Sequence, residues 1–273
     1  MPEGPEIRLA ADRIAKVLVG QRIEDVAFGL QPLKRFEKRL AGRQVTAIDT
    51  RGKAMLTRFD NGLTLYSHNQ LYGRWYTTRR PKTPKTSRQL RVALHTRTHS
   101  ALLYSASDIA VLTERGLARH PFLNRVGPDI LDPTLTPGAI VERLASRTFR
   151  NRALGSLYLD QAFLAGNGNY LRSEILWAAR VNPASKPAQL SNTERHRIAR
   201  ATLGISRRSY RTRGVTAPMK QATERKAMGM SYGQYRFQAF GREGLSCYEC
   251  GHIIERHTMG SRNIFVCPMC QSV

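Results

Sequence analysis

The chain has 273 residues, of which 44 are Lys or Arg and 20 are Asp or Glu, so its formal net charge is +24. This length suffices for two domains of ordinary size. No run of about 18 apolar residues occurs, and the first residues hold two glutamates where a signal peptide has an apolar stretch, which predicts a cytoplasmic protein without a membrane span. The basic excess favours nucleic acid as the partner, and an anionic membrane or an acidic protein is the alternative.

The positive charge is concentrated in the region 195–226, which contains ten basic residues and one acid, Glu224. A solvated helix face usually mixes both signs of charge. This region is therefore expected to lie against phosphates.

The first expected element is a helix that begins at Pro5 and ends before Gly20. Proline suits the first position of a helix, because a backbone N–H at that position would have no partner within the helix. From about residue 22 to 104 the pattern changes to short β-like runs with turn residues between them, which predicts a β-sandwich. The expected strands are 22–28, 44–50, 54–59, 63–67, 90–95 and 101–104, and 79–88 is expected to be an exposed loop.

A linker rich in proline and glycine follows at about 127–135, and beyond it the apolar spacing becomes helical. Ser191 and Glu194 form a capping-box pattern at the start of the last long helix. The expected helices begin at 137, span 154–165, begin after Asn169 and begin after Ser191.

The turn Gly166-Asn167-Gly168-Asn169 joins two of these helices. Such a turn exposes backbone N–H groups at a helix N-terminus, where the partial positive charge favours a phosphate. A plain tight connection between helices is the simpler alternative, but the charge of the chain favours phosphate binding.

All the cysteines lie near the end of the chain, in two C-x2-C pairs that are separated by 16 residues. Disulfides are the alternative, but a basic chain without a signal peptide indicates a reducing compartment. The spacing predicts one structural Zn²⁺ held by four thiolates at the base of a β-hairpin, with no open position for catalysis. The expected zinc ligands are Cys247, Cys250, Cys267 and Cys270.

Three signatures in the right order resemble the formamidopyrimidine-DNA glycosylase/endonuclease VIII family. They are PEGPE at 2–6, LDQAFLAGNGNYLRSEIL at 159–176, and the four-cysteine hairpin. TLYSHNQLYG at 64–73 and YSASD at 104–108 make the chain most similar to the bacterial endonuclease VIII branch, as does Gly4. The resemblance covers nearly the whole chain and implies a DNA repair enzyme of the bacterial cytoplasm, bound to the nucleoid through its DNA and acting as a monomer.

The fold that follows is α+β, with an N-terminal β-sandwich and leading helix, then a helical helix–two-turns–helix domain with a zinc-finger β-hairpin. The expected domains are 1–126 (catalytic sandwich), 127–135 (linker), 136–230 (helical DNA-binding domain with a flexible basic loop at 206–230) and 231–273 (zinc finger).

The resemblance implies a bifunctional DNA glycosylase and abasic-site lyase for oxidised pyrimidines. Removal of Met1 would expose the secondary amine of Pro2 as the nucleophile, and an α-amino group is partly neutral near pH 8. Glu3 would act as general acid/base, and Arg262 would hold the phosphate beside the lesion. Lys53 would contact a phosphate and transfer protons during β,δ-elimination, whereas in isolation it would be one more surface lysine. On their own, Glu3 and Glu6 would be assigned to charge complementarity at a helix N-terminus.

The resemblance also implies DNA contacts. Gln70, Leu71 and Tyr72 would enter the duplex where a base has flipped out, Arg125 and Asn169 would contact the backbone, and Glu6 would support the active site. The simpler alternative for Leu71 and Tyr72 is a buried strand-to-loop junction.

Two features depart from the family pattern. Asn167 stands in the turn where relatives usually have an apolar residue, and the region 206–230 is unusually basic, so Tyr210 and Arg213 match the family only weakly. The alternatives are an enzyme for oxidised purines, a DNA-binding protein without activity, and a zinc-ribbon protein that binds RNA.

Overall fold

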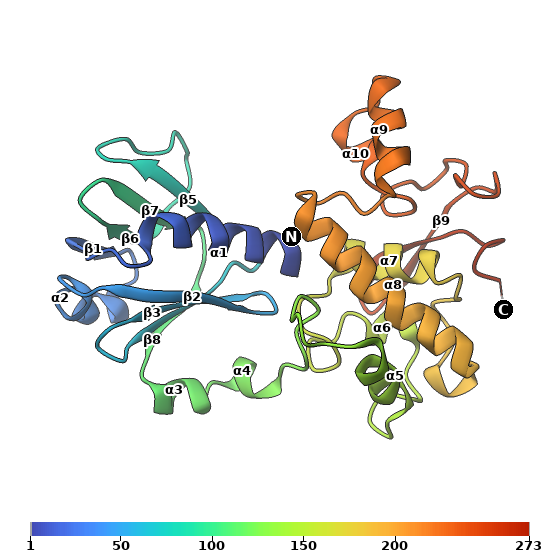
Figure 1. Ribbon diagram of the computed structural model, residues 1–273, viewed down its shortest axis with the longest axis horizontal. Coiled ribbons are helices and arrows are strands. Elements are labelled where there is room, and N and C mark those ends of the chain that lie inside the picture. Colours follow the sequence, from blue (N-terminus) through green and yellow to red (C-terminus); the bar gives the residue numbers. More distant parts are fainter. Residues whose placement is uncertain (1, 273) are drawn as a thin grey trace. The chain divides into compact units, whose positions relative to one another are not determined.

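A computed structural model describes residues 2–272, so Met1, whose expected removal exposes Pro2, lies outside the described residues. The chain divides into two compact units (Figure 1). Within the described residues, unit 1 contains Pro2 and Glu6–Arg125, and unit 2 contains Glu3–Pro5 and the chain from Val126 onward. Between residues 2 and 272, no helix is both long and apolar enough to span a bilayer.

The leading helix α1 covers Gly4–Leu18, which confirms the helix expected from the apolar spacing. Its buried face includes Ala11, Ile14 and Leu18, which are at most 1% exposed. These side chains join one apolar cluster with residues of both sheets of unit 1, so the helix is held by burial of this face.

Unit 1 contains two four-stranded antiparallel sheets, in the orders β1-β6-β7-β5 and β2-β3-β4-β8. The sandwich is therefore confirmed, with β5 and β8 added to the expected strands. The strands are β1 (Asp25–Phe28), β2 (Val45–Arg51), β3 (Ala54–Phe59), β4 (Thr64–His68), β5 (Arg74–Arg79), β6 (Leu90–His95), β7 (His99–Tyr104) and β8 (Asp108–Leu112). The short helices of this unit are η1 (Gln31–Phe36), α2 (Glu37–Leu40), α3 (Glu114–Ala118) and α4 (Pro121–Arg125).

Three connections between strands lie at one end of the sandwich. The β4–β5 and β7–β8 connections both pass from one sheet to the other, and the register pairs His68 with Asp108 and Arg74 with Tyr104. Ala54 also pairs with His68, so the β2–β3 turn that carries Lys53 lies at this same end.

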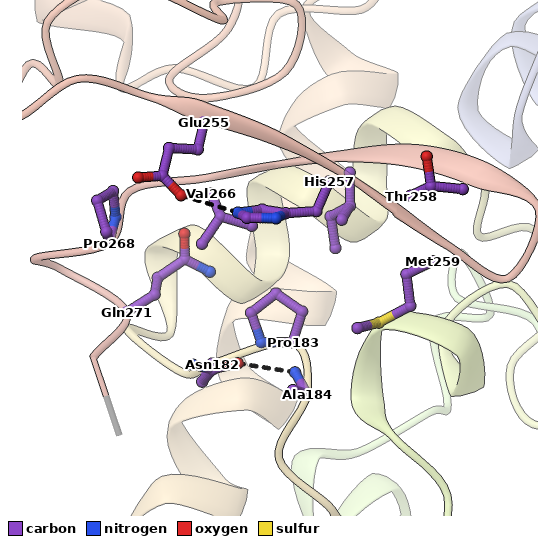
Figure 2. Close-up of a pocket in the computed structure, with 11 residues that line it drawn as sticks. Asn182, Pro183, Ala184, Glu255, His257, Thr258, Met259, Val266, Pro268 and Gln271 are labelled. Atoms are coloured by element: carbon purple, nitrogen blue, oxygen red, sulfur yellow. Dashed lines mark hydrogen bonds and ion pairs between the residues drawn. The ribbon is translucent and has the colours of Figure 1, made fainter.

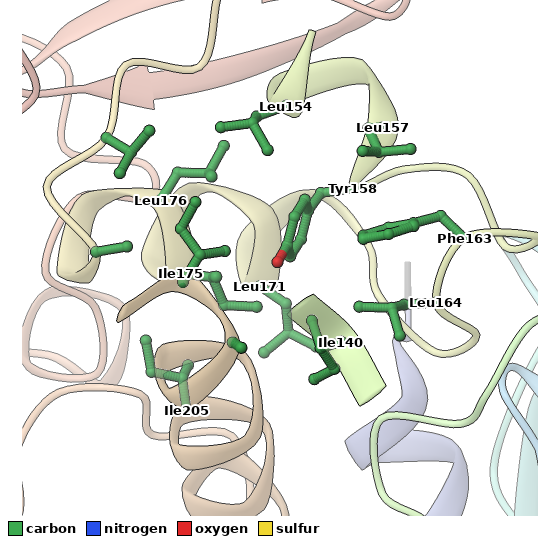
Figure 3. Close-up of a cluster of buried hydrophobic side chains, with 14 of the residues drawn as sticks. Ile140, Leu154, Leu157, Tyr158, Phe163, Leu164, Leu171, Ile175, Leu176 and Ile205 are labelled. Carbon is green, nitrogen blue, oxygen red and sulfur yellow. The ribbon is translucent and has the colours of Figure 1, made fainter. Parts of the chain in front are cut away.

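Unit 2 is built from helices around one apolar core. The helices are α5 (Pro137–Ala145), α6 (Leu154–Leu157), α7 (Asn169–Ala178), η2 (Pro187–Gln189), α8 (Asn192–Arg211), α9 (Met219–Ala227) and α10 (Tyr232–Tyr235). Figure 3 shows side chains of α5, α6, α7 and α8 meeting in this core, with Leu171 and Ile175 of α7 among them. Ser191 and Glu194 form both bonds of the expected capping box.

Two expectations for unit 2 are wrong. The helix expected over 154–165 ends at Leu157, because Asp160 Oδ1 accepts the N–H of Ala162 (2.8 Å) and this local bond replaces a helical one. The basic loop expected at 206–230 is largely helical, since α8 continues to Arg211 and α9 follows. Several of its arginines are used inside the unit, as when Arg208 donates to the Thr216 carbonyl (2.6 Å), so they are not all directed at phosphates.

The chain ends in the expected hairpin, formed by β9 (Glu255–Met259) and β10 (Arg262–Val266). Met259 pairs with Arg262, which leaves Gly260 and Ser261 as a two-residue turn with φ of 62° and 57°. Positive φ at both positions is the geometry of the tight hairpin turn that matches strand twist. Arg262 therefore lies at the tip of the hairpin.

Candidate active site

The carboxylate of Glu3 is seated on the N-terminus of α7, within unit 2. Its Oε1 accepts the N–H of Tyr170 (2.8 Å) and its Oε2 accepts the N–H of Leu171 (3.3 Å), and Glu3 is 3% exposed. The residue before α7 is Gly168, which has no side chain with which to cap the helix. Glu3 therefore does the capping from a distant part of the sequence, where the positive end of the helix attracts its charge.

Glu3 and Gly4 pack closely against the turn that precedes α7. A Cβ atom at Gly168 would overlap the Glu3 carboxylate, so any other residue at this position would displace the carboxylate from the N-terminus of α7. The N–H of Gly4 also donates to the Gly166 carbonyl (2.8 Å), which holds the start of the chain against the turn. Two of the N–H groups expected to bind phosphate are thus occupied by Glu3, and Glu3 complements α7 and not its own helix.

Arg172 connects this turn to the terminal hairpin. Its side chain is fully buried, and its guanidinium donates to the carbonyls of Gly155 and Met259 (both 2.8 Å). It also donates to Asn169 Oδ1 (2.7 Å), the Asn263 carbonyl (3.0 Å) and the Arg262 carbonyl (3.3 Å). Burial, opposed by the charge of Glu3, lowers the pKa of Arg172 to about 10, so it stays protonated at neutral pH. Glu3, Asn169 and Arg262 are therefore brought into one cluster.

The contacts of Arg172 also orient the two predicted backbone ligands of this unit. Because Asn169 Oδ1 faces Arg172, its amide nitrogen Nδ2 is turned away from the guanidinium. Arg172 binds the backbone carbonyl of Arg262, and the exposed Arg262 side chain lies at the hairpin tip. Both residues thus present donors that suit an anion.

A second buried charge, Glu174, fastens the segment that leads to the cysteines. Glu174 is 1% exposed and accepts the N–H groups of Gln238, Ala239 and Phe240 and the hydroxyl of Thr216 (2.6 Å). Neither Arg172 nor Glu174 was among the predicted site residues. The available signal was two opposite charges within the apolar run of α7, where charges without partners are costly.

The Sγ atoms of the predicted zinc ligands lie within 4.8 Å of one another. Cys250 Sγ is 3.4 Å from the Sγ atoms of Cys267 and Cys270, and Cys247 Sγ is 3.9 Å from Cys270 Sγ. Four thiolates around one tetrahedral Zn²⁺ would be about 3.8 Å apart. The cluster can therefore hold a metal ion.

Unit 1 places Lys53 beside a small polar group at the end of its second sheet. Lys53 is half-buried, as is His68 on the neighbouring strand. Burial lowers the pKa of His68, and the positive charge of Lys53 lowers it further while Asp108 opposes the shift. The imidazole next to Lys53 is therefore held neutral at physiological pH.

Gln70, Leu71 and Tyr72 lie in the β4–β5 connection at this same end. Leu71 is 53% exposed and Tyr72 is 69% exposed. The alternative of a buried strand-to-loop junction is therefore wrong, and large apolar side chains project from unit 1.

The remaining predicted residues have fewer described contacts. Pro2 is half-buried and directly precedes Glu3, and Glu6 is half-buried in the first turn of α1. Arg125 is the last residue of α4, and among the described contacts none joins it to another predicted site residue.

A hollow of about 440 Å³ opens on the side of the terminal hairpin (Figure 2). Its lining includes Pro183 and Met259, and an ion pair joins His257 to Glu255 (2.9 Å). It contains no predicted site residue, and Asn182 Oδ1 already accepts the N–H of Ala184 (2.8 Å). The hollow therefore adds no predicted residue to the candidate site, and it adjoins that site at Met259, whose carbonyl accepts a hydrogen bond from Arg172.

Family models match both parts of the chain. The formamidopyrimidine-DNA glycosylase N-terminal domain matches residues 1–107, and the formamidopyrimidine-DNA glycosylase H2TH domain matches residues 126–220. The chain belongs to the formamidopyrimidine-DNA glycosylase family, whose members are base-excision repair enzymes.

Within this family, the chain is similar to endonuclease 8. It is 51% identical over 271 residues to the endonuclease 8 of an Escherichia coli strain and to that of Salmonella arizonae, covering 99% of this chain and 100% of each relative. The expected resemblance is therefore confirmed.

Solved structures share the fold. The Lactococcus lactis Fpg bound to abasic-site DNA matches with a TM-score of 0.82 at 19% identity, covering 99% of this chain and all of that chain. The Lactococcus lactis Fpg bound to DNA with an oxidised pyrimidine matches with a TM-score of 0.82 at 20% identity, covering 100% of both chains.

Proposed function

We propose that the chain removes oxidised pyrimidines from double-stranded DNA and then cuts the strand at the resulting abasic site, with the Pro2 amine as nucleophile. The observation that carries this proposal is the seat of Glu3 on α7. It fixes a carboxylate directly after Pro2 and in the same cluster as Asn169 and Arg262. The 51% identity to endonuclease 8 supports the choice of reaction.

In the first step the neutral Pro2 nitrogen attacks C1′ of the damaged nucleotide, the bond from C1′ to the base breaks, and the departing base takes up a proton from water. Glu3 accepts the proton that the Pro2 nitrogen loses and delivers it to the ring oxygen as the C1′–O4′ bond opens, which leaves an iminium ion between C1′ and the nitrogen. A secondary amine cannot lose this charge by deprotonation at nitrogen, so the neighbouring C2′ proton becomes acidic.

Strand cleavage follows from that acidity. Loss of the C2′ proton expels the 3′ phosphate by β-elimination, and loss of the C4′ proton expels the 5′ phosphate by δ-elimination. Lys53 transfers protons in these steps, and Arg262 holds the phosphate beside the lesion through its guanidinium. Water then hydrolyses the remaining Schiff base, leaving a one-nucleotide gap with phosphate at both ends.

The protein holds the DNA through contacts with the phosphate backbone and through side chains that stack on the bases. Asn169 donates its Nδ2 hydrogens to a phosphate, and Arg125 contributes a second backbone contact. Gln70, Leu71 and Tyr72 fill the hole that the flipped nucleotide leaves, which offsets the free energy lost on unstacking. Glu6, one helical turn after Glu3, supports the reacting groups.

The metal in the cysteine cluster is Zn²⁺ in this proposal, and it is structural, because four thiolates leave no ligand position for substrate. Cys247, Cys250, Cys267 and Cys270 hold it, and it stabilises the hairpin that presents Arg262. The protein acts as a monomer in the bacterial cytoplasm, where its DNA lies.

The proposal is tested by excision rates on matched duplexes that contain thymine glycol or 8-oxoguanine. Faster release of thymine glycol is expected, and faster release of 8-oxoguanine would assign the enzyme to oxidised purines. Pro2→Gly should still bind the lesion duplex but cut it far more slowly, and cleavage at the wild-type rate would remove Pro2 from the mechanism.

Wild-type protein that binds duplex DNA and cuts neither lesion would be a binding protein without activity. Tighter binding to single-stranded RNA than to the lesion duplex would contradict the proposal altogether.

A further inference from the structure

Residues 69–73, called here the insertion loop, keep large apolar side chains in solvent. The loop connects β4 in one sheet to β5 in the other, and both Leu71 and Tyr72 are more than half exposed. A mobile loop would lower its free energy by laying these side chains on the protein surface. Something must therefore hold the loop outward.

The backbone of the insertion loop is tightly closed. The N–H of Gly73 donates to the Asn69 carbonyl (2.7 Å), and a Cβ atom at Gly73 would lie 2.5 Å from that oxygen. Gln70 has a φ of 51°, in the left-handed region that residues other than glycine seldom occupy. Such strain persists only where surrounding contacts impose it, and it is concentrated at functional sites.

Three side chains outside the loop impose this shape. His68 Nδ1 accepts the N–H of Gln70 (3.1 Å), and Ser107 Oγ donates to Gln70 Oε1 (2.8 Å). The Arg88 guanidinium donates to the carbonyl of Tyr72. The anchors therefore fix the backbone on both sides of Leu71 and one side chain next to it.

The topology explains how segments far apart in sequence meet here. Ser107 lies in the β7–β8 connection, which passes between the sheets next to the insertion loop, as the pairs His68–Asp108 and Arg74–Tyr104 require. The β5–β6 connection has to return along its sheet, because β5 and β6 both pair antiparallel with β7, where Tyr104 faces both Arg74 and Leu90. This return brings Arg88 back to Tyr72.

We propose that Ser107 and Arg88, together with His68, are positioning residues that hold the insertion loop in its inserting shape before DNA binds. The inference rests on the proposed function, which assigns Gln70, Leu71 and Tyr72 to the interior of the duplex. A loop that is already ordered loses little conformational freedom on insertion, so more of the contact energy is retained in the flipped complex. Only duplex DNA has a hole to fill, so these anchors select for lesions in duplex DNA over lesions in single strands.

The test compares the double variant Ser107→Ala/Arg88→Met with wild type, using thymine glycol in a duplex and in the same strand alone. Single-turnover cleavage of the duplex should fall at least about fivefold, the factor expected for the loss of one ordinary hydrogen bond, whereas cleavage of the single strand should not change. Amide hydrogen exchange over residues 69–73 should become faster in the free protein. Arg88→Lys with Ser107 retained should recover most of the duplex rate.

Ser87→Ala/Arg79→Met is the matched control, since it removes one serine hydroxyl and one arginine guanidinium without touching the insertion loop. Ser87 lies in the β5–β6 connection and Arg79 is the last residue of β5, and neither side chain has a described contact with residues 69–73. It should behave as wild type. Unchanged hydrogen exchange together with an unchanged duplex rate in Ser107→Ala/Arg88→Met would overturn the inference, as would an equal loss on both substrates.

Leu71→Ala separates this inference from the proposed function. If Leu71→Ala slows duplex cleavage and Ser107→Ala/Arg88→Met does not, insertion stands and the positioning role is wrong. If Leu71→Ala itself leaves duplex cleavage unchanged, the insertion role assigned under the proposed function is wrong.

Discussion

Replacement of Asn167 by leucine should stabilise unit 2. The Asn167 side chain is fully buried, and neither its Oδ1 nor its Nδ2 has a hydrogen-bond partner among the described residues. The turn does not depend on this side chain, because Gln161 holds the backbone by accepting the N–H of Gly166 (3.0 Å) and donating to the Asn167 carbonyl (2.9 Å). Leucine has the same branching as asparagine and no polar atoms to satisfy.

The magnitude follows from two opposing effects. A buried amide without partners costs about 1–3 kcal/mol, and removing that cost favours Asn167→Leu. Two methyl groups are larger than the oxygen and nitrogen that they replace, and overpacking offsets about 1 kcal/mol of the gain. The free energy of unfolding should rise by up to about 2 kcal/mol, which raises Tm by up to roughly 6 °C in a chain of this size.

Urea denaturation and a thermal scan of both proteins measure this change. Asn167→Ala is the control, because it removes the same polar atoms but leaves a cavity, and it should be less stable than Asn167→Leu. A loss of 1 kcal/mol or more in Asn167→Leu would refute the reasoning, since it would show that the asparagine amide makes stabilising contacts.

Other consequences can be measured separately. Glu174→Ala leaves three backbone N–H groups without their acceptor and removes one of the two acceptors of the Thr216 hydroxyl, the other being the Arg236 carbonyl. It should lower the free energy of unfolding by about 4 kcal/mol, as read from urea denaturation, and a loss below about 1 kcal/mol would contradict the anchoring role. Arg172→Lys keeps the positive charge but removes the planar set of N–H donors that binds Asn169 and Arg262. Strand cleavage should therefore fall roughly 100-fold while the amount of bound metal stays the same. Full activity would show that the guanidinium does not position Asn169 and Arg262. The pKa of His68 in the folded protein lies below the ordinary 6.5, so its contribution to stability is complete above pH 6.5 and is lost as the pH falls through the folded pKa. His68→Asn should therefore flatten the dependence of the free energy of unfolding on pH in this range. An unchanged dependence would assign it to other groups.

Local patterns were sufficient to predict much of the fold. The leading helix, the capping box at Ser191 and the cysteine hairpin each depend on residues close together in sequence, and all are present. β5 and β8 were missed because neither strand alternates between buried and exposed residues, and each contains a single buried residue, Trp75 in β5 and Val111 in β8. The helix expected over 154–165 failed for another local reason, the bond from the Ala162 N–H to Asp160, which apolar spacing alone does not reveal.

The candidate site was predictable in its residues but not in its contacts. The resemblance named Glu3, Asn169 and Arg262, whereas the bond from Tyr170 to Glu3 joins residues 167 positions apart, and no spacing rule predicts it. Arg172 is the residue that joins the site, and in sequence it is one arginine among many. The same holds for Ser107, which reaches Gln70 only through the order of the strands.

The most direct test of the central claim is borohydride trapping on a duplex with a single thymine glycol, followed by peptide mapping of the cross-link. A covalent adduct at the nitrogen of Pro2 is expected in protein from which Met1 has been removed. Trapping at a lysine such as Lys53, or no adduct in processed protein that cuts the duplex, would contradict the assignment of Pro2 as the nucleophile.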